Sequence, residues 1–429
     1  MNDDPYNRLP DEIKQKYNII YSELLTEDFT LFRNKDLKFG VLKSFKKWGL
    51  FTSYQYLIKP IYNSIGFNKN LNLFQASIFE NDQWDADKNK EFYLNTDGKI
   101  VWELNRGEFS LIDDFGNIFI EKNKKIGLVD QNFNQIIEPK YDRINTLNQN
   151  YFKVFVNGRY GIINQKAEII FDADADEIFN NCTNSTALIY KNNTYYSFNF
   201  DHKTLTELPF DKILYASSNS YKAPTQESQN LYKSIKNIQP NDEHDFISDE
   251  LLNYKGKWGI IDTSGTEIIP NEYDYVDFLR NPNYFLVGIG EIETYEFVDE
   301  DLEDRTGIKN IKWGIVDKNN NTVVPIIYDW IDEVEETIWV VYEGGNTFYD
   351  DEYWKNTNGK LGAYNLNQLI VPIEYDTIKN NWFRIKEYIF VQNGTKYFDD
   401  NSIEYDVYTT NGFKIESDKP NPKEYTYFD

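Results

Sequence analysis

Acidic and aromatic side chains are interleaved in three stretches of the sequence, 79–91, 291–304 and 343–354. Aromatic anchors ringed by charge are typical of protein-binding hot spots, where the ring enters a desolvated pocket and the charges guide the encounter. These stretches therefore predict a partner-binding surface; the alternative is polar loops whose aromatics fold back as local core. The predicted binding residues are Trp84, Asp85, Asp87, Glu293, Tyr295, Glu300, Asp301, Tyr349, Asp350, Asp351 and Trp354.

The overall charge favours a basic partner. The chain has 70 acidic and 45 basic residues, which gives a net charge of −25. Such a chain is repelled by nucleic-acid phosphates and by anionic membranes, and it attracts basic surfaces. Solubility alone is the competing interpretation of this charge.

Residues for catalysis or metal binding are sparse in the sequence. The only histidines are His202 and His244, and Cys182 is the only cysteine. Phosphate loops, zinc-ligand spacings and nucleophile elbows do not occur in the sequence. We therefore expect no enzyme, metal or cofactor. With so many acidic residues, a hydrolase that uses a pair of carboxylates stays open as an alternative.

One short segment imitates the beginning of a calcium-binding loop. Asp172, Asp174 and Asp176 alternate as the first ligands of an EF-hand do, but Glu177 stands where that loop needs glycine. Thr183 stands where the bidentate glutamate should be. Calcium binding is therefore the weaker interpretation of this segment.

A repeated unit must position the predicted binding residues. Its clearest copy is 258–276, where Trp258-Gly259 opens a short strand and a turn follows at 262–265. A second strand is expected to end at Pro270, because proline has no N–H for a sheet ladder. The copy closes on Tyr273-Asp274. We expect this aspartate to bond to the backbone of a turn.

The same frame recurs about nine times, at a minimum spacing of about 34 residues. A further strand precedes each opening, and in the copy at 151–163 an Asn-Gly pair joins the two strands, which is a strong hairpin signal. Each copy is thus predicted to be a three-stranded antiparallel meander. The openings are Trp48-Gly49, Phe92, Ile126-Gly127, Tyr160-Gly161, Tyr196, Trp258-Gly259, Trp313-Gly314, Leu361-Gly362 and Asp406.

Five copies carry extra residues between the leading strand and the opening. Insertions at one equivalent position of a repeat array line up on one edge, and that edge is often the binding face. The predicted binding residues fall in three of these enlarged hairpin tips. The longest insertion, at about 220–254, includes a possible short helix at 228–238.

The opening and closing motifs resemble those of the WG-repeat family, also called KWG repeats, which is mostly bacterial. The resemblance rests on KKWGLF (46–51), GKWGIID (256–262) and IKWGIVD (312–317), and it covers about 36–416. It implies a binding scaffold without catalytic residues. Trp48, Trp258 and Trp313 recur with the repeat period, which favours core packing over a role as ligand-stacking platforms.

The expected fold is all-β: a curved, solenoid-like array of these meanders. A closed β-propeller is the alternative; its blades usually have four strands, so three-stranded copies favour the open array. Helical spacing at 10–25 predicts a long helix that caps the first copy. The expected parts are the cap (1–35), five copies (36–215), an insertion loop (216–254) and four copies (255–429).

The function expected from the sequence is non-catalytic protein binding, in which the acidic and aromatic edge captures a basic protein. One form of it is a bacterial immunity or inhibitor protein. A carbohydrate-binding repeat protein that uses exposed aromatics is the alternative. We expect a cytoplasmic monomer, since MNDDPYNRLP lacks the features of a signal peptide, although export without a leader stays open.

Overall fold

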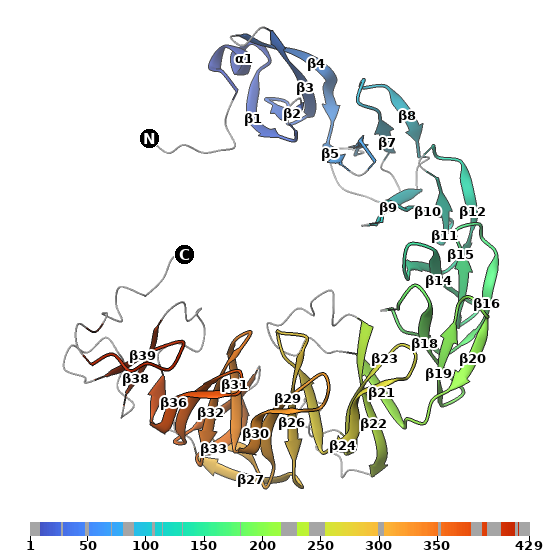
Figure 1. Ribbon diagram of the computed structural model, residues 1–429. Coiled ribbons are helices and arrows are strands. Elements are labelled where there is room, and N and C mark those ends of the chain that lie inside the picture. Colours follow the sequence, from blue (N-terminus) through green and yellow to red (C-terminus); the bar gives the residue numbers. More distant parts are fainter. Residues whose placement is uncertain are drawn as a thin grey trace. The chain divides into compact units, whose positions relative to one another are not determined.

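The chain forms two compact units, Met1–Ala175 and Asp176–Asp429, and each is described by itself. Figure 1 shows the computed structural model, coloured along the sequence. The structure describes residues 9–26, 29–47, 51–69, 71–79, 90–104, 108–113, 115–130, 132–180, 182–215, 230–239, 254–298, 304–350, 353–378, 388–392, 405–416 and 419.

Unit 1 contains four antiparallel sheets of four strands each, which follow one another along the chain. The first two are β1 (Ile19–Leu24), β2 (Phe29–Asn34), β3 (Phe39–Lys47) and β4 (Phe51–Tyr62), then β5 (Ser64–Asn68), β6 (Leu73–Ile78), β7 (Lys90–Leu94) and β8 (Ile100–Glu103). The next two are β9 (Phe109–Ile112), β10 (Ile118–Lys122), β11 (Lys125–Val129) and β12 (Gln135–Tyr141), then β13 (Arg143–Thr146), β14 (Tyr151–Val156), β15 (Arg159–Asn164) and β16 (Ile169–Ala175).

Unit 2 continues the pattern and adds hairpins to it. Its first two sheets are β17 (Glu177–Ile178), β18 (Thr186–Lys191), β19 (Thr194–Asn199) and β20 (Thr204–Glu207), then β21 (Lys212–Tyr215), β22 (Leu231–Gln239), β23 (Lys255–Asp262) and β24 (Glu267–Tyr273). A sheet of β25 (Tyr275–Phe278), β26 (Tyr284–Ile289), β29 (Lys312–Asp317) and β30 (Thr322–Tyr328) follows. The last two are β31 (Trp330–Glu335), β32 (Ile338–Glu343), β35 (Lys360–Asn365) and β36 (Gln368–Tyr375), then β37 (Thr377–Ile378), β38 (Tyr388–Gln392) and β39 (Asp406–Thr409).

The prediction of three-stranded copies is wrong, because the closing motif supplies a fourth strand. Tyr273 ends β24, and the chain continues past Asp274 into β25, which pairs with β26 of the next sheet. The residues predicted to close one copy therefore begin the next sheet. Four strands is also the usual number in a propeller blade, so strand count does not separate the two architectures considered above.

The glycine of the opening motif lies where the outer strand bulges. Trp258 pairs with Tyr273 and Ile260 with Ile269. Between these two pairs, β23 has one residue, Gly259, and β24 has three, 270–272, so β24 bulges there. A Cβ on Gly259 would lie 2.5 Å from the carbonyl oxygen of Ile269. Only glycine fits at this close approach.

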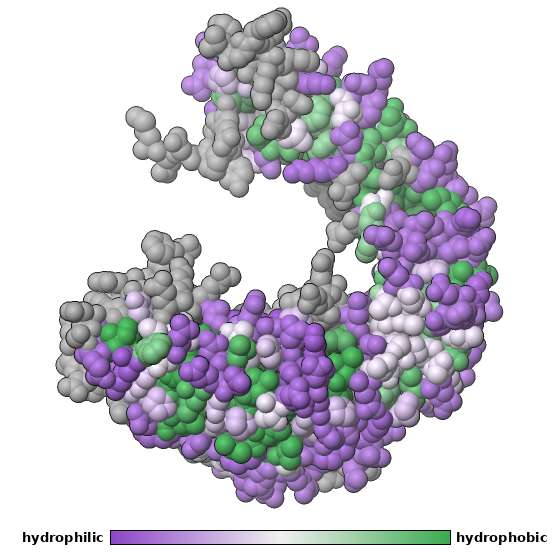
Figure 2. Space-filling view, in the orientation of Figure 1, coloured by the Kyte–Doolittle hydropathy of each residue, from purple (hydrophilic) through white to green (hydrophobic). Residues whose placement is uncertain are grey.

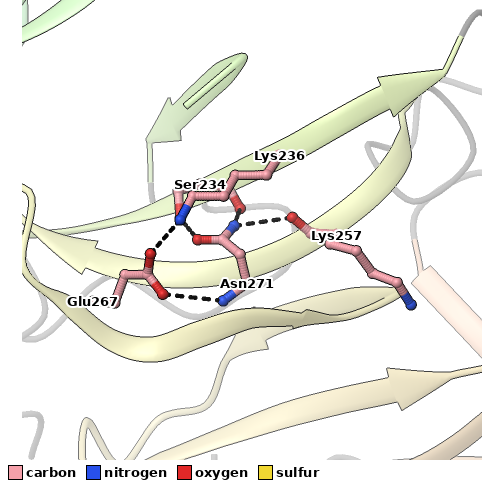
Figure 3. Close-up of polar contacts among 5 residues, drawn as sticks. All are labelled: Ser234, Lys236, Lys257, Glu267 and Asn271. Atoms are coloured by element: carbon pink, nitrogen blue, oxygen red, sulfur yellow. Dashed lines mark hydrogen bonds and ion pairs between the residues drawn. The ribbon is translucent and has the colours of Figure 1, made fainter. Parts of the chain in front are cut away.

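The bulge is filled by one side chain that ties three strands together. Asn271, which lies in the bulge, donates from Nδ2 to the carbonyl oxygens of Ser234 (2.8 Å) on β22 and Lys257 (2.9 Å) on β23. Ser234 Oγ donates in return to Asn271 Oδ1 at 3.1 Å, and Lys236 pairs with Glu267 beside them (Figure 3). A side chain at position 259 would compete for this space, since its Cβ would be 3.0 Å from Asn271 Cγ.

The same bulge recurs in the copies that have the glycine. At Gly40, Gly127, Gly161, Gly314 and Gly362 a Cβ would lie 3.0 Å or less from a carbonyl oxygen of the outer strand. Ser197 stands at the glycine's position in β19, and β19 pairs with β20 without a register shift. Pro270 lies inside β24 in the bulge, so the prediction that it ends the strand is wrong.

The first copy opens earlier than predicted. Phe39 pairs with Tyr62 and Val41 with Ile58, which is the pattern of the other openings with Gly40 between. Trp48-Gly49 instead falls between the paired residues Lys47 and Phe51, outside the described residues. Among the described residues, the opening of the first copy is therefore Phe39-Gly40.

The N-terminal segment is mostly strand. Helix α1 spans only Asp11–Lys16, and Asn18 follows with φ 53°, which stops the helix. β1 and β2 then belong to the first sheet, so the predicted helix at 10–25 and the helical cap over 1–35 are wrong in extent. Two side chains of the α1 region, Ile13 and Tyr17, pack on a small buried cluster of Leu9, Phe32 and Leu42.

The helix predicted at 228–238 is also wrong, because β22 occupies Leu231–Gln239 and pairs with β23. The strand is buried on both faces: Tyr232 and Ile235 are fully buried and belong to two different core clusters. The predicted insertion loop thus contains the leading strand of its own copy. The described residues include no helical segment with the length and hydropathy of a membrane span.

The motif tryptophans are core residues. Trp258 and Trp313 have no exposed surface, and the ring of Tyr275 lies between them at centroid distances of 5.0 and 5.7 Å. They belong to one hydrophobic cluster that continues through the sheets of unit 2 from Ile235 to Tyr408. The prediction of core packing is confirmed for these two residues, and Trp48 lies outside the described residues.

We predict that Gly259→Ala lowers the free energy of unfolding by about 1–3 kcal/mol, because the new Cβ forces the bulge apart. Gly66→Ala is the matched control, since a Cβ there meets no atom within 4 Å. Urea unfolding of both variants measures the effect. Equal losses of stability would contradict the close-approach argument.

Buried tyrosines predict a loss of stability in alkali. Burial, chiefly, raises the pKa of Tyr93 to about 12. Above pH 10 the unfolded chain releases this proton while the folded chain keeps it, so stability falls as pH rises, by about 1.4 kcal/mol per pH unit for one such group. Urea titrations between pH 10 and 12 should give Tyr93→Phe the shallower decline, and identical slopes would contradict this.

Candidate functional site

Two of the predicted hairpin tips combine into one additional sheet. The chain between β26 and β29 forms β27 (Glu293–Val298) and β28 (Asp304–Lys309), and the chain between β32 and β35 forms β33 (Asn346–Asp350) and β34 (Tyr353–Thr357). β28 pairs with β33, which gives a four-stranded antiparallel sheet in the order β27-β28-β33-β34. We call it the tip sheet. In Figure 1, β27 runs along the lower rim of unit 2.

Glycines and closing aspartates fix the points where both hairpins leave the repeat sheets. Gly290 has φ 133° and its N–H donates to Asp274 Oδ2 at 2.8 Å. Gly344 has φ 76° and its N–H donates to Asp329 Oδ2, also at 2.8 Å. The expectation that the closing aspartates bond to turn backbone is confirmed at both positions.

The inner face of the tip sheet packs on the core of unit 2. Ile308 and Thr347, which pair across β28 and β33, are 5% and 3% exposed. Thr347 Oγ1 donates to the carbonyl oxygen of Asp329 at 3.2 Å, and the rings of Trp354 and Trp330 lie 5.9 Å apart. These contacts hold the tip sheet against the repeat sheets.

The opposite face carries an aromatic cluster with cations over it. Phe297 lies edge-on to Phe348 at 5.4 Å and beside Tyr295 at 5.7 Å. Arg305 is placed over the ring of Phe348 at 5.6 Å, and Lys309 over Tyr295 at 5.8 Å. Each cation–π pair contributes about 0.5–1 kcal/mol at an exposed site, so the cluster orders the face.

Comparison with known proteins decides the family of the repeats. A family model described as "WG containing repeat" matches residues 126–160, 258–291 and 313–344. The chain therefore contains WG repeats. No curated protein is similar enough to the chain to count as a match.

Solved structures resemble this WG-repeat protein only distantly. A eukaryotic initiation factor has 10% identity and a TM-score of 0.32, over 80% of this chain and 86% of that one. Kluyveromyces lactis Hsv2 has 11% identity and a TM-score of 0.24 (65% and 87%), and the WD40 propeller domain of Doa1 has 7% and 0.22 (67% and 91%). TM-scores below 0.5 carry no argument about fold or function.

The WG-repeat frame brings five predicted binding residues into the tip sheet. Glu293 and Tyr295 lie on β27, Tyr349 and Asp350 on β33, and Trp354 on β34. Six others lie outside the described residues: Trp84, Asp85, Asp87, Glu300, Asp301 and Asp351. Convergence of the tip at 79–90, which belongs to unit 1, with the tip sheet stays a prediction.

Trp354 was predicted to be a binding anchor, and no basic residue of the site was predicted. Trp354 is half-buried and packs on the hydrophobic core of unit 2. Arg305 and Lys309 were overlooked, although they alternate along β28 with the same period as the aromatics of β27. Lys309 forms an ion pair with Glu293 at 3.4 Å, so the described part of the tip sheet carries both basic and acidic side chains.

The segment that resembles the start of a calcium-binding loop consists of the end of strand β16 and the closing aspartate of its repeat. Asp172 and Asp174 are exposed on β16, and Asp176 Oδ2 accepts a hydrogen bond from the N–H of Asn192 at 2.8 Å. His202 is exposed in the turn between β19 and β20. Within the described residues there is no group of three or more histidine, cysteine or acidic side chains placed to hold a metal ion.

We predict that the two hairpins are energetically coupled through their aromatic rings. Phe297→Ala, Phe348→Ala and the double variant form a mutant cycle across β27 and β33. An edge-to-face pair should give a coupling energy of about 0.5–1.5 kcal/mol, measured by urea unfolding. Phe278 with Phe297 is the uncoupled control, since Phe278 packs on Phe285 of another sheet. Additive effects of Phe297 and Phe348 would contradict the shared sheet.

Proposed function

We propose that this WG-repeat protein is a non-catalytic binding scaffold whose tip sheet captures a basic protein partner. The observation that carries the proposal is the pairing of β28 with β33, which unites two acidic insertions in one sheet. An immunity or inhibitor protein that neutralises a cationic toxin is one concrete form of this function.

The strand order brings acidic sequence to one end of the tip sheet. The residues that join β27 to β28 include Asp299, Glu300, Asp301 and Glu303, and those that join β33 to β34 are Asp351 and Glu352. The described residues that flank these two segments, the pair Val298–Asp304 and the pair Asp350–Tyr353, lie at the same end of the tip sheet. Asp304 and Asp350, which begin β28 and end β33, mark that end.

Charge at this end would act mainly on the encounter with a partner. Complementary charge at an interface rim raises the association rate and its salt dependence, and contributes less to the lifetime of the complex. The net charge of −25 adds a long-range attraction for basic proteins. A carbohydrate ligand, the alternative considered above, would bind by stacking and would respond little to salt.

The visible surface of unit 2 supports a binding mode that does not rely on one large apolar patch. Figure 2 shows hydrophobic residues there in small groups, separated by hydrophilic ones. Surfaces of this kind bind through a few anchors with charge around them.

We predict that neutralising Glu300, Asp301, Asp350 and Asp351 to Gln or Asn slows association with the partner several-fold at low salt and flattens the salt dependence. The partner is first isolated from cells that produce the protein, and surface plasmon resonance then measures both rates. The free energy of unfolding, measured in urea, should change little.

The matched control neutralises four exposed acidic residues elsewhere in unit 2: Asp201, Glu207, Glu374 and Glu416. It changes the net charge by the same amount, so it separates local from overall electrostatics. If both variants slow association equally, the acidity is a property of the whole chain, and the proposed site is wrong.

A further inference from the structure

The edge of the tip sheet differs from the other long edges of this protein. β27 pairs with β28 over all of Glu293–Val298 without a register shift. Every other described edge strand of six or more residues pairs with a shift; these strands are β1, β4, β12, β16, β24, β30, β31 and β36. Bulges protect edges against pairing with another chain, and β27 has no bulge.

β27 also lacks the residues that usually protect an edge. Its sequence, Glu-Thr-Tyr-Glu-Phe-Val, has no proline, glycine or lysine, whereas β4, β12, β24, β30 and β36 each contain proline. Its described backbone pairing is with β28 alone. Every second residue of β27 therefore directs its N–H and C=O away from the sheet, as a strand at an edge does.

The side chains of β27 favour a basic strand beside it. Glu293 and Glu296 are exposed and are the only charged residues of β27. They are three positions apart and so lie on opposite faces of the sheet. Between and beside them are Tyr295 and Phe297, which are half-buried, and Val298, which is 59% exposed. A guest strand with cations three residues apart, separated by β-branched residues, complements both faces.

We propose that β27 binds an extended, basic segment of the partner protein by adding it as a fifth strand to the tip sheet. Main-chain hydrogen bonds would supply affinity, and the two glutamates would select basic residues. This inference rests on the proposed function and specifies how the partner is held. A second copy of this chain is the competing occupant, and its charge of −25 opposes that pairing.

The test uses a fluorescein-labelled peptide, Thr-Lys-Val-Thr-Lys-Val-Thr, whose lysines have the spacing of Glu293 and Glu296. Its control is the same peptide N-methylated at the threonines and valines, which keeps the charge and removes hydrogen-bond donors on both edges. Fluorescence anisotropy should show at least about tenfold weaker binding of the methylated peptide. Hydrogen exchange of the full chain should show new protection in 293–298 when the unmethylated peptide is bound.

Two protein variants test the role of the glutamates. Glu293→Gln with Glu296→Gln should weaken peptide binding several-fold, whereas Asp201→Asn with Glu207→Gln, which removes the same charge elsewhere, should not. Equal loss in both variants would mean that the peptide senses only overall charge, and would overturn the selection by β27.

Three results would overturn strand addition: no peptide binding, equal binding of the two peptides, or binding without protection of 293–298. Concentration-dependent dimerisation in sedimentation, with 293–298 protected in the free protein, would assign the edge to a second copy instead. The acidic capture proposed above is judged separately, because its variants change Glu300, Asp301, Asp350 and Asp351 and leave β27 intact.

Discussion

Asp274 lies between two consecutive sheets of unit 2 and is hydrogen-bonded to residues of both. The way in which these sheets follow one another depends on such an aspartate. Asp274 accepts from Lys257 Nζ at 2.6 Å in its own sheet and from the N–H of Gly290 in the next. Its own N–H donates to the carbonyl oxygen of Gly288 at 2.9 Å. A half-exposed ion pair of this kind contributes little to stability. Instead, the aspartate fixes the position at which the next hairpin begins. The two hairpins of the tip sheet begin at Gly290 and Gly344, which are bonded to Asp274 and Asp329.

A second constraint is the missing side chain at the opening glycine. Because Gly259 has no Cβ, β24 can bulge over it, and Asn271 of β24 then bonds to β22 and β23 from within the bulge. The bulge also makes β24 a poor template for another chain, since its ladder is interrupted and Pro270 has no N–H. One glycine thus shapes the sheet and protects its edge. The copy with Ser197 at this position pairs regularly along a strand of only four residues, β20.

The repeat and its core were predictable from the sequence because their signals are local and periodic. The openings at Ile126, Tyr160, Trp258 and Trp313 lie in equivalent strands, and the tryptophans are buried as expected. The fourth strand was not predictable in this way, since Tyr273-Asp274 ends one sheet and begins the next within a few residues. At the N-terminus, apolar spacing favoured a helix, but Ile19 and Ile20 are β-branched and lie in strand β1, which spacing alone does not reveal.

The candidate site shows where sequence reasoning stops. Insertions at equivalent positions were expected to lie on one edge, but a pairing such as Gly307 with Phe348 depends on contacts between residues far apart in the chain. The nearest sequence signal was the alternation of Tyr295 and Phe297 in β27.

Neither hairpin of the tip sheet would be stable on its own, because an isolated two-stranded hairpin is marginal in water. Together they form four strands with one face on the core, where Ile308 and Thr347 are buried. The connection between them is short: only Gly307 and Ile308 of β28 pair with β33. Ordering of one hairpin therefore favours ordering of the other across this junction. A strand added at β27 would widen the four-stranded sheet to five strands, and it would favour the ordered state of the hairpin that it joins.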